Sequence, residues 1–160
     1  MPKFKVKRLT PTAKLPEKTH ATDTGWDLFV DRVENGPGRE QLTVYTGLAI
    51  QPDPGFYAQI YPRSSVAKKK LQLANSVGII DEDYRGEIRL VFNKIPDGAG
   101  GYDGGYYLTY PLDCHIAKGE KIAQLVVCWR FDTEWEEVTD LGDTARGAGG
   151  FGSTRSEDVV

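Results

Sequence analysis

The sequence has few of the residues on which several classes of protein depend. Its two cysteines and two histidines are too few for a disulfide framework or a zinc site. No apolar run approaches the roughly 20 residues that span a bilayer, and the N-terminal segment lacks the apolar stretch of a signal peptide. The net charge of −3 gives no general attraction for nucleic acid. We therefore expect a cytoplasmic domain that binds neither membranes nor nucleic acids.

The cysteines, histidines and clustered lysines are more typical of ordinary structural roles than of a metal site or a nucleic-acid site. Cys114 and Cys128 can pair, but two core thiols are more typical of an intracellular chain. His20 and His115 have no nearby cluster of metal ligands, and Lys68–Lys70 is the one basic run. Three lysines are more typical of a solvated edge than of a nucleic-acid patch.

The chain reads as one β-rich domain. Its 160 residues, with 39% hydrophobic and 27% charged content, suit a globular protein of ordinary size. Glycine and proline separate short segments that alternate polar with apolar residues or are rich in β-formers. This pattern predicts an all-β sandwich or barrel of the jelly-roll kind with one short helix. The expected strands cover 4–9, 42–50, 56–61, 87–93, 106–110 and 121–131, and the helix covers 64–70.

A glycine-rich run near the C-terminus is the most informative segment. Glycine lets the backbone approach a ligand, Arg146 can grip a phosphate, Phe151 can cover a flat ring, and Ser153 and Thr154 can donate hydrogen bonds. A Walker phosphate loop is excluded, because Ser153 follows Gly152 directly with no lysine between them. The run predicts a flexible arm that closes over a ligand with both phosphate and base. From composition alone, a disordered linker is the alternative.

A second glycine-rich segment, residues 97–107, is also rich in tyrosine and reads as a loop excursion. A long hairpin loop is one interpretation. A surface that binds a partner is the other, because long irregular loops in compact domains are often functional.

Three shorter clusters place polar side chains beside strands. Asp27 lies on a tight turn where a strand begins, which is common for aspartate. Arg63, Ser64 and Ser65 stand at the expected helix start, where they can either bind an anion or cap the helix. Gln124 interrupts an apolar strand, and its amide needs a partner in the core or in a ligand.

Residues 75–87 read as two apolar strands joined by an acidic turn. Asp81 directly follows Ile79 and Ile80. An acid at the rim of a buried hairpin is a candidate general base, although a plain hairpin turn also fits the pattern.

In this order, the clusters resemble the five motifs of the homotrimeric dUTP pyrophosphatase (dUTPase) family. The chain departs from the family pattern at Thr24, usually alanine, at Ser65, usually glycine, and at Arg155, usually glycine; Ile79 and Lys121 are milder changes. The excursion after residue 96 looks like an insertion between the third and fourth motifs, as in some phage members. The matching segments are Thr24–Leu28, Pro62–Ser65, Gly78–Gly86, Gly119–Leu125 and Arg146–Thr154.

The resemblance implies that the chain cleaves dUTP to dUMP and pyrophosphate with Mg²⁺, which limits uracil incorporation into DNA and supplies dUMP for thymidylate synthesis. Asp81 would be the general base for a water that attacks the α-phosphorus. Asp27 would contact Mg²⁺ through water. The residues that the resemblance assigns to the substrate are Arg63, Ser64, Ser65, Asn75, Gly78, Ile79, Ile80, Tyr84, Arg89, Gln124, Arg146, Phe151, Gly152, Ser153 and Thr154.

Within this set the implied roles differ by segment. The hairpin and Asn75 would read the uracil between its two strands, and Tyr84 would exclude a ribose by packing against the sugar. Phe151 would stack on the base. Arg63, Ser64, Ser65 and Gln124 would hold the phosphate chain in line, and Arg146 would clamp the γ-phosphate together with Ser153 and Thr154.

The resemblance also implies a homotrimer with shared active sites. Residues 1–145 would form one β-barrel domain with a loop insertion at about 96–111, and residues 146–160 the closing arm. If phage-encoded, the protein would act in the host cytoplasm. Two alternatives stay open: a dCTP deaminase, with or without a pyrophosphatase step, and a protein-binding regulator on the same fold. The segment from Asp97 to Tyr110 would be the contact surface for a protein partner.

Overall fold

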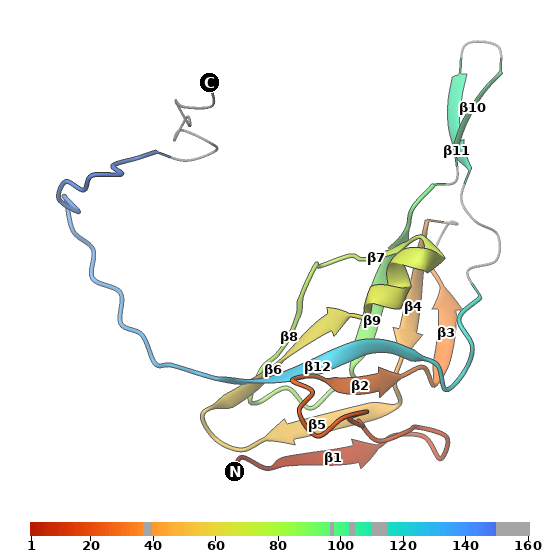
Figure 1. Ribbon diagram of the computed structural model, residues 1–160, viewed down its shortest axis with the longest axis horizontal. Coiled ribbons are helices and arrows are strands. Elements are labelled where there is room, and N and C mark those ends of the chain that lie inside the picture. The colour runs from red at the N-terminus through yellow and green to blue at the C-terminus, as the bar shows by residue number, and fades with distance from the viewer. Residues whose placement is uncertain (37–39, 97, 103–104, 110–114, 150–160) are drawn as a thin grey trace.

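The computed structural model describes residues 1–36, 40–96, 98–102, 105–109 and 115–149, of which 98–109 are described by backbone alone. These residues form an all-β fold, as predicted, in which one short 3₁₀-helix accompanies two four-stranded sheets packed face to face (Figure 1). Several residues of the sequence interpretation lie outside the described residues: Cys114, Phe151, Gly152, Ser153, Thr154 and Arg155.

The first sheet is built around the longest strand, as the sequence predicts. Its order is β2-β12-β6-β8 and all pairs are antiparallel. Strand β12 ends at Trp129, two residues before its expected end. The strands are β2 (Trp26–Phe29), β6 (Phe56–Pro62), β8 (Gly78–Ile80) and β12 (Lys121–Trp129).

The second sheet has the order β3-β4-β9-β7, again antiparallel. Its residues alternate in burial: Leu42 and Val44 of β4 and Leu90 and Phe92 of β9 are buried, whereas their neighbours face outward. This alternation is typical of a sheet with one face on the core. The strands are β3 (Arg32–Asn35), β4 (Gln41–Tyr45), β7 (Leu71–Leu73) and β9 (Arg89–Lys94).

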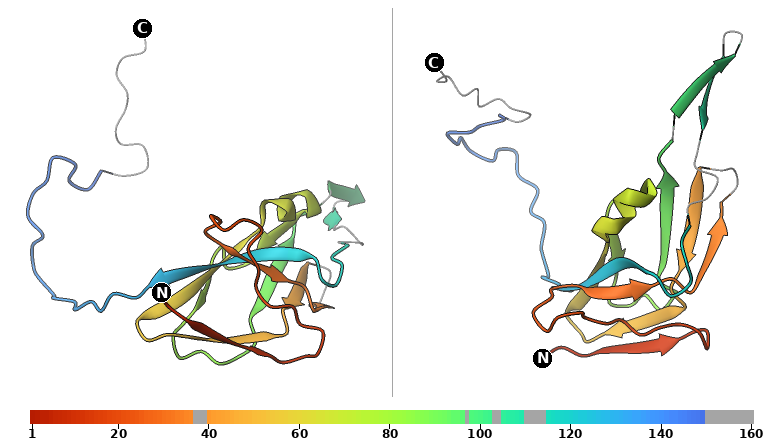
Figure 2. Two further views of the ribbon diagram at one scale, coloured as in Figure 1. Left: turned by 60° about the horizontal axis from the view of Figure 1, so that its bottom comes forward. Right: turned by 45° about the vertical axis from the view of Figure 1, so that its right-hand side comes forward.

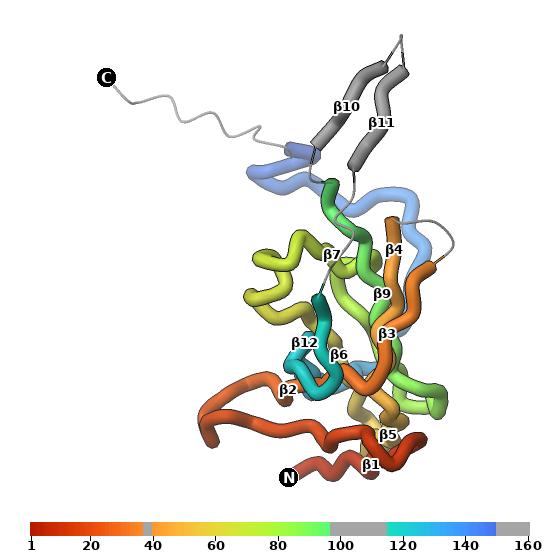
Figure 3. The backbone as a smooth tube through the Cα atoms, turned by 90° about the vertical axis from the view of Figure 1, so that its right-hand side faces the viewer, coloured from red at the N-terminus to blue at the C-terminus, as the bar shows by residue number. Residues whose placement is uncertain are grey.

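The expected single strand over 42–50 is wrong, because the chain turns at Gly47. This glycine has φ +67°, and a Cβ there would lie 2.8 Å from both Ala13 Cβ and Thr10 Oγ1. Strand β4 therefore stops before the turn. Strand β5 (Leu48–Pro52) pairs instead with β1 (Phe4–Arg8) across one end of the two sheets (Figures 1 and 3).

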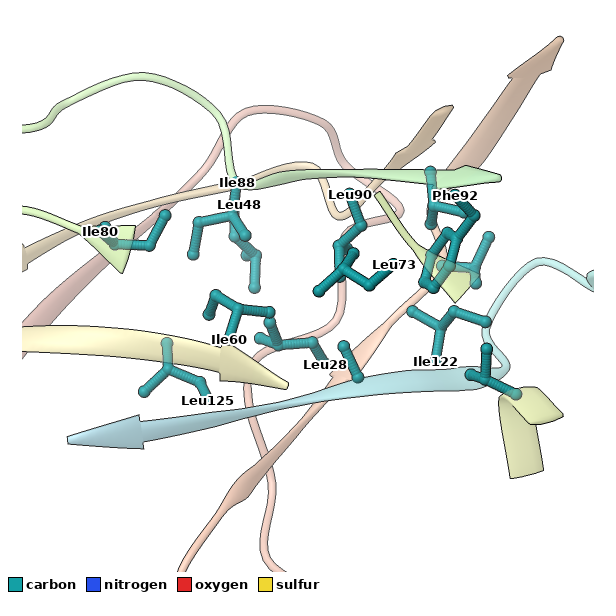
Figure 4. Close-up of a cluster of buried hydrophobic side chains, with 14 of the residues drawn as sticks. Leu28, Leu48, Ile60, Leu73, Ile80, Ile88, Leu90, Phe92, Ile122 and Leu125 are labelled. Atoms are coloured by element: carbon teal, nitrogen blue, oxygen red, sulfur yellow. The ribbon is translucent and has the colours of Figure 1, made fainter. Parts of the chain in front are cut away.

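The core lies between the two sheets (Figure 4). Leu28, Ile60 and Leu125 from the first sheet face Leu90 and Phe92 from the second, and all are nearly inaccessible to solvent. Burial of this apolar surface is the main force that holds the sheets together.

The core thiol expected at Cys128 is wrong. Its side chain is only half-buried, and its sulfur lies 3.8 Å from the Val126 carbonyl on the same strand. Side chains alternate between the two faces of a strand, and Leu125 of β12 is buried in the core. Cys128, three residues later, therefore lies on the outer face of β12.

The expected hairpin over 75–87 is also wrong in its pairing. Strand β8 pairs with β6 in the first sheet, whereas β9 pairs with β4 and β7 in the second. Residues 81–88 therefore cross from one sheet to the other. The short helix η1 (Ser64–Lys69) is confirmed and links β6 to β7.

Two segments extend away from the packed sheets, which we call the body. The excursion forms a hairpin of β10 (Gly98–Tyr102) and β11 (Gly105–Thr109), which pair antiparallel and extend beyond the end of β9 (Figures 1 and 2). After β12, residues 130–149 run away from the sheets (Figure 1). Within the described residues, no helix has the length and apolar character needed to cross a membrane.

Candidate active site

A pocket of about 500 Å³ opens where the chain crosses between the sheets. Strand β8 and the turn after it come from the first sheet, and β4, β7 and β9 come from the second. The size is within the range of small-molecule sites. Seven predicted substrate or catalytic residues line it together: Asn75, Gly78, Ile79, Ile80, Asp81, Tyr84 and Arg89.

Asp81 and Tyr84 are held by the tight turn that follows β8. The Tyr84 amide donates to the Asp81 carbonyl at 3.2 Å, and the Tyr84 hydroxyl donates to the Glu87 carbonyl at 3.1 Å. A Cβ at Gly86 would lie 2.5 Å from the Tyr84 Cζ, so only glycine lets the phenol ring fold over this position. Both residues line the pocket and are exposed to solvent.

Part of this pocket was not anticipated from the sequence. Tyr45 and Glu87 line it, and Glu87 Oε1 accepts a hydrogen bond of 2.8 Å from the Gly47 amide. Arg32 lies over the Tyr45 ring at 3.5 Å from its centroid, and its guanidinium is 3.5 Å from Glu87 Oε1. The only signal for Tyr45 is its outward position in an alternating strand, which does not by itself indicate a site.

A second pocket of about 410 Å³ adjoins the first. Leu73 lines both, and the neighbours Asn75 and Ser76 each line one. Ser76 has φ +60°, an uncommon conformation for a residue with a side chain. Of the predicted residues, Arg63 and Ser64 line this second pocket, and Ser65 is exposed beside it.

Arg63 is held by Asp27. The Arg63 guanidinium donates to Asp27 Oδ1, and Lys121 Nζ lies 2.8 Å from Asp27 Oδ2. Burial alone raises the pKa of Asp27, but the hydrogen bonds from Lys121 and Arg63, with their charges, outweigh it and leave the pKa below its usual value. The buried carboxylate is therefore ionised and fixes two cations.

The start of η1 decides between the two interpretations of Arg63, Ser64 and Ser65. Arg63 occupies the N-cap position with extended backbone, and no side chain makes a capping hydrogen bond. The capping alternative is therefore wrong, and both serines are exposed, with Ser64 in the lining of the second pocket.

Gln124 is half-buried on β12, in register with Asp27 on one side and Tyr61 on the other. A Cβ at Gly25 would lie 3.0 Å from the Gln124 Cβ, so glycine lets the turn before β2 pack on this glutamine. Asp27, Arg63 and Gln124 thus form one group on the first sheet, separate from the group around Asp81.

The C-terminal segment is not brought to either pocket within the described residues. Arg146 Nε donates to the Gly149 carbonyl at 3.0 Å, and the Gly147 amide donates to the Thr144 carbonyl at 3.0 Å. Phe151 and the residues after it lie outside the described part of the chain.

Within the described residues, no group of three or more His, Cys, Asp or Glu side chains is arranged to hold a metal. The ionised carboxylate of Asp27 fits Mg²⁺, which usually keeps several waters and binds through one or two carboxylates and substrate phosphates.

Comparison with known proteins decides the family. The model of the dUTPase family matches residues 12–95 and 111–155 of this chain. The chain belongs to the dUTPase family. The unmatched residues between the two segments contain the β10–β11 hairpin, which is therefore an insertion relative to the family, as predicted.

Individual dUTPases resemble the chain over most of its length. The deoxyuridine 5'-triphosphate nucleotidohydrolase of Gloeothece citriformis is 41% identical over 154 residues, which cover 95% of this chain and 96% of that protein. The dUTPase of Staphylococcus bacteriophage 80alpha, solved with dUPNHPP, has a TM-score of 0.76 at 27% identity and covers 96% of this chain and 98% of its own.

A third similar structure concerns a metal. A point mutant of the dUTPase from phage phi11 of S. aureus, described with a structural Mg(II) ion, has a TM-score of 0.69 at 25% identity and covers 88% of this chain and 99% of its own. These findings confirm the jelly-roll fold and the dUTPase interpretation, and none of them supports the deaminase alternative.

Proposed function

We propose that the chain hydrolyses dUTP to dUMP and pyrophosphate, which keeps uracil out of DNA and provides dUMP for thymidylate synthesis. The observation that carries this function is the pocket that gathers Asn75, Asp81 and Tyr84 in a chain of this family. Release of pyrophosphate from dUTP, dCTP, dTTP and UTP with Mg²⁺ tests it. Release from dUTP alone supports the proposal, whereas equal release from all four contradicts it.

The chemistry assigns Asp81 as the general base. Its carboxylate takes a proton from water, the water oxygen bonds to the α-phosphorus, and the bond from that phosphorus to the bridging oxygen breaks. Pyrophosphate leaves with that oxygen. The exposed position of Asp81 at the rim of the pocket gives a water access to it.

The pocket around β8 is suited to a pyrimidine nucleoside. Gly78, Ile79 and Ile80 present backbone groups and apolar surface, and Asn75 offers an amide that can pair with a base edge. Tyr84, held by Glu87 and given room by Gly86, packs against the sugar and leaves no space for a 2′-hydroxyl. Arg89 lies on the same wall as a further substrate contact.

The group of residues around Asp27 binds the phosphate chain of the substrate. Arg63, oriented by the ionised Asp27, supplies positive charge, and Ser64, Ser65 and Gln124 supply hydrogen bonds. Positioning of a triphosphate in line for attack is itself a large part of catalysis. Arg146, Gly152, Ser153 and Thr154 complete the clamp, and Phe151 covers the base.

Mg²⁺ is the cofactor, and it neutralises charge on the triphosphate when bound. Asp27 would hold it through a bound water. A carboxylate with two oxygens offers about four acceptor positions, so its bonds to Arg63, Lys121 and Thr19 leave capacity for a hydrogen bond from such a water.

Membership of the family supports a homotrimer with shared sites. Asp81 lines one pocket of this subunit and Arg63 lines the adjoining one, and in the trimer each complete site would draw on more than one chain. Residues 1–145 form the body and its connecting segment, and residues 146–160 form the arm that closes on a neighbour. Trp135 and Leu141 on the departing segment are 93% and 92% exposed, which a neighbouring subunit would cover.

The insertion supports a second role, contact with a protein partner in the cytoplasm where the enzyme acts. The strands β10 and β11 pair with each other and extend beyond the sheet to which β9 belongs. A variant that replaces Asp97–Tyr110 with a short glycine linker should keep dUTP hydrolysis and lose the partner. Loss of hydrolysis would instead make the hairpin part of the enzyme.

A further inference from the structure

Three separate segments meet at the side chain of Glu82. Its Oε2 accepts a hydrogen bond of 3.0 Å from the Gly55 amide in the turn before β6. The same oxygen lies 3.3 Å from Arg130 Nε. The Arg130 amide in turn donates to the Gly55 carbonyl at 2.8 Å. This closed set of contacts joins the turn after β8, the turn before β6 and the first residue after β12.

On one side, Glu82 is fixed to the turn that carries the proposed base. It directly follows Asp81, and its carbonyl accepts a hydrogen bond of 2.6 Å from the Arg85 guanidinium. Asp81 and Tyr84 line the pocket, whereas Glu82 is not among the lining residues. Its carboxylate is therefore directed to Gly55 and Arg130, and away from the substrate.

On the other side, Arg130 stands where the C-terminal segment leaves the body. Trp129 before it packs edge-on against Phe56, with ring centroids 4.7 Å apart. Asp132 also pairs with Arg130 at 2.6 Å. Beyond it, the hydrogen bonds among the described residues are local, such as that from the Gly142 amide to Asp140. Within the described chain, Arg130 is thus the last residue that hydrogen-bonds to the body, and only the tilted ring contact of Phe131 with Trp129, at 6.5 Å between centroids, follows it.

We propose that Glu82 and Arg130 are a positioning pair that sets the direction of the C-terminal arm relative to the turn of Asp81. The inference rests on the proposed dUTP hydrolysis and deepens it. A tether whose first residue is fixed explores fewer directions, and this raises the effective concentration of its far end at a given site. Because Arg130 is half-exposed, the pair contributes little to folding stability.

The test compares Arg130→Gln and Glu82→Gln with wild type, in the full chain and in a chain that ends before Arg146. Gln at 82 keeps an oxygen that can accept from the Gly55 amide but removes the charge that attracts Arg130. Arg130→Lys keeps the charge, and Arg8→Gln, at an exposed arginine of β1, is the matched control.

In the full chain, both Gln variants should lower kcat for dUTP about 3- to 10-fold with KM changed by less than about twofold. Arg130→Lys and Arg8→Gln should stay near wild type. In the truncated chain, the Gln variants should have no further effect on kcat, because there is no arm left to direct. An unchanged kcat in the full chain, or an equal loss with and without the arm, overturns the proposal.

A readout without nucleotide separates this inference from the proposed function. A dye on Thr144→Cys, in a chain without Cys114 and Cys128, reports the wobble of the arm by time-resolved anisotropy. Arg130→Gln should lower the residual anisotropy and Arg8→Gln should not. If wild type fails to hydrolyse dUTP but this difference appears, the proposed function is wrong and the positioning pair stands; equal anisotropy overturns the pair.

Discussion

The carboxylate of Asp27 bonds to the guanidinium of Arg63, so a buried acid orients the cation that is proposed to hold the phosphates. Asp27 is 3% exposed, and Lys121 occupies its second oxygen. The arrangement gives Asp27 a role in both stability and catalysis, and these two roles can be separated by experiment.

Asp27→Asn should destabilise the fold by about 2–3 kcal/mol at pH 7, less than a fully buried pair because both cations are partly exposed. It should also lower kcat for dUTP, because Arg63 loses its orienting partner. Asp31→Asn is the control: Asp31 is also buried, but its carboxylate bonds to Thr10, Thr12 and Lys118 and lines neither pocket. It should reduce stability in urea unfolding and leave kcat near wild type. Equal kcat in both variants would contradict the role of Asp27.

The stability contributed by Asp27 should depend on pH. Its folded pKa lies below its usual value of 3.8, so the folded state favours the ionised form. The contribution is therefore complete above pH of about 4 and is lost as the pH falls through the folded pKa. The stability difference between wild type and Asp27→Asn should be largest at neutral pH and smaller at pH 3. A difference that grows on acidification would contradict this assignment.

Asp81→Asn should bind dUTP with nearly unchanged affinity and lose kcat by about 10²–10⁴-fold. Asp83→Asn is a matched control, because Asp83 is exposed in the same turn but does not line the pocket. Steady-state pyrophosphate release and equilibrium binding of dUTP measure the two effects. Undiminished turnover by Asp81→Asn would refute the base assignment.

Gly86→Ala should weaken the discrimination between dUTP and UTP. The added Cβ forces the Tyr84 ring from its place, since it would lie 2.5 Å from Cζ. The ratio of kcat/KM for UTP to that for dUTP should rise about tenfold or more. Tyr84→Phe keeps the ring and loses only the hydrogen bond to the Glu87 carbonyl, so it should retain most of the selectivity. An unchanged ratio in Gly86→Ala would exclude Tyr84 as the sugar contact.

A chain that ends before Arg146 should keep its unfolding free energy within about 0.5 kcal/mol, because residues 146–148 are exposed. Its kcat should fall at least about 100-fold, since an arginine on a phosphoryl group can contribute more than that in other enzymes. Native mass spectrometry of the full chain should show a trimer. A stable, active monomer would contradict the shared-site proposal.

Local patterns in the sequence predicted much of the fold. Strand β6 is predicted to within one residue and β9 to within two, because their side chains alternate between core and surface. The break at Gly47 was missed because the residues around it are all β-formers, and only the contacts of Thr10 and Ala13 require the turn. The partners of β8 and β9 were missed because strand pairing is a tertiary property.

Some residues of the candidate site can likewise be predicted from local patterns, and others are brought to the site only by the fold. Asp81 and Arg63 stand in compact motifs and can be found from neighbours in the chain. The link between Glu82 and Arg130 joins residues 48 positions apart, and neither carries a local signal. Tyr45 reaches the pocket because β4 pairs with β9, which no short segment of sequence encodes.

The central claim is that water attacks the α-phosphorus of dUTP. Hydrolysis in ¹⁸O-labelled water, followed by mass spectrometry of both products, tests it most directly. One ¹⁸O atom should appear in dUMP and none in pyrophosphate, and Asp81→Asn should lower the rate of labelling about 10²–10⁴-fold. Label in pyrophosphate would place the attack on the β-phosphorus, and the absence of labelled product from wild type would contradict dUTP hydrolysis itself.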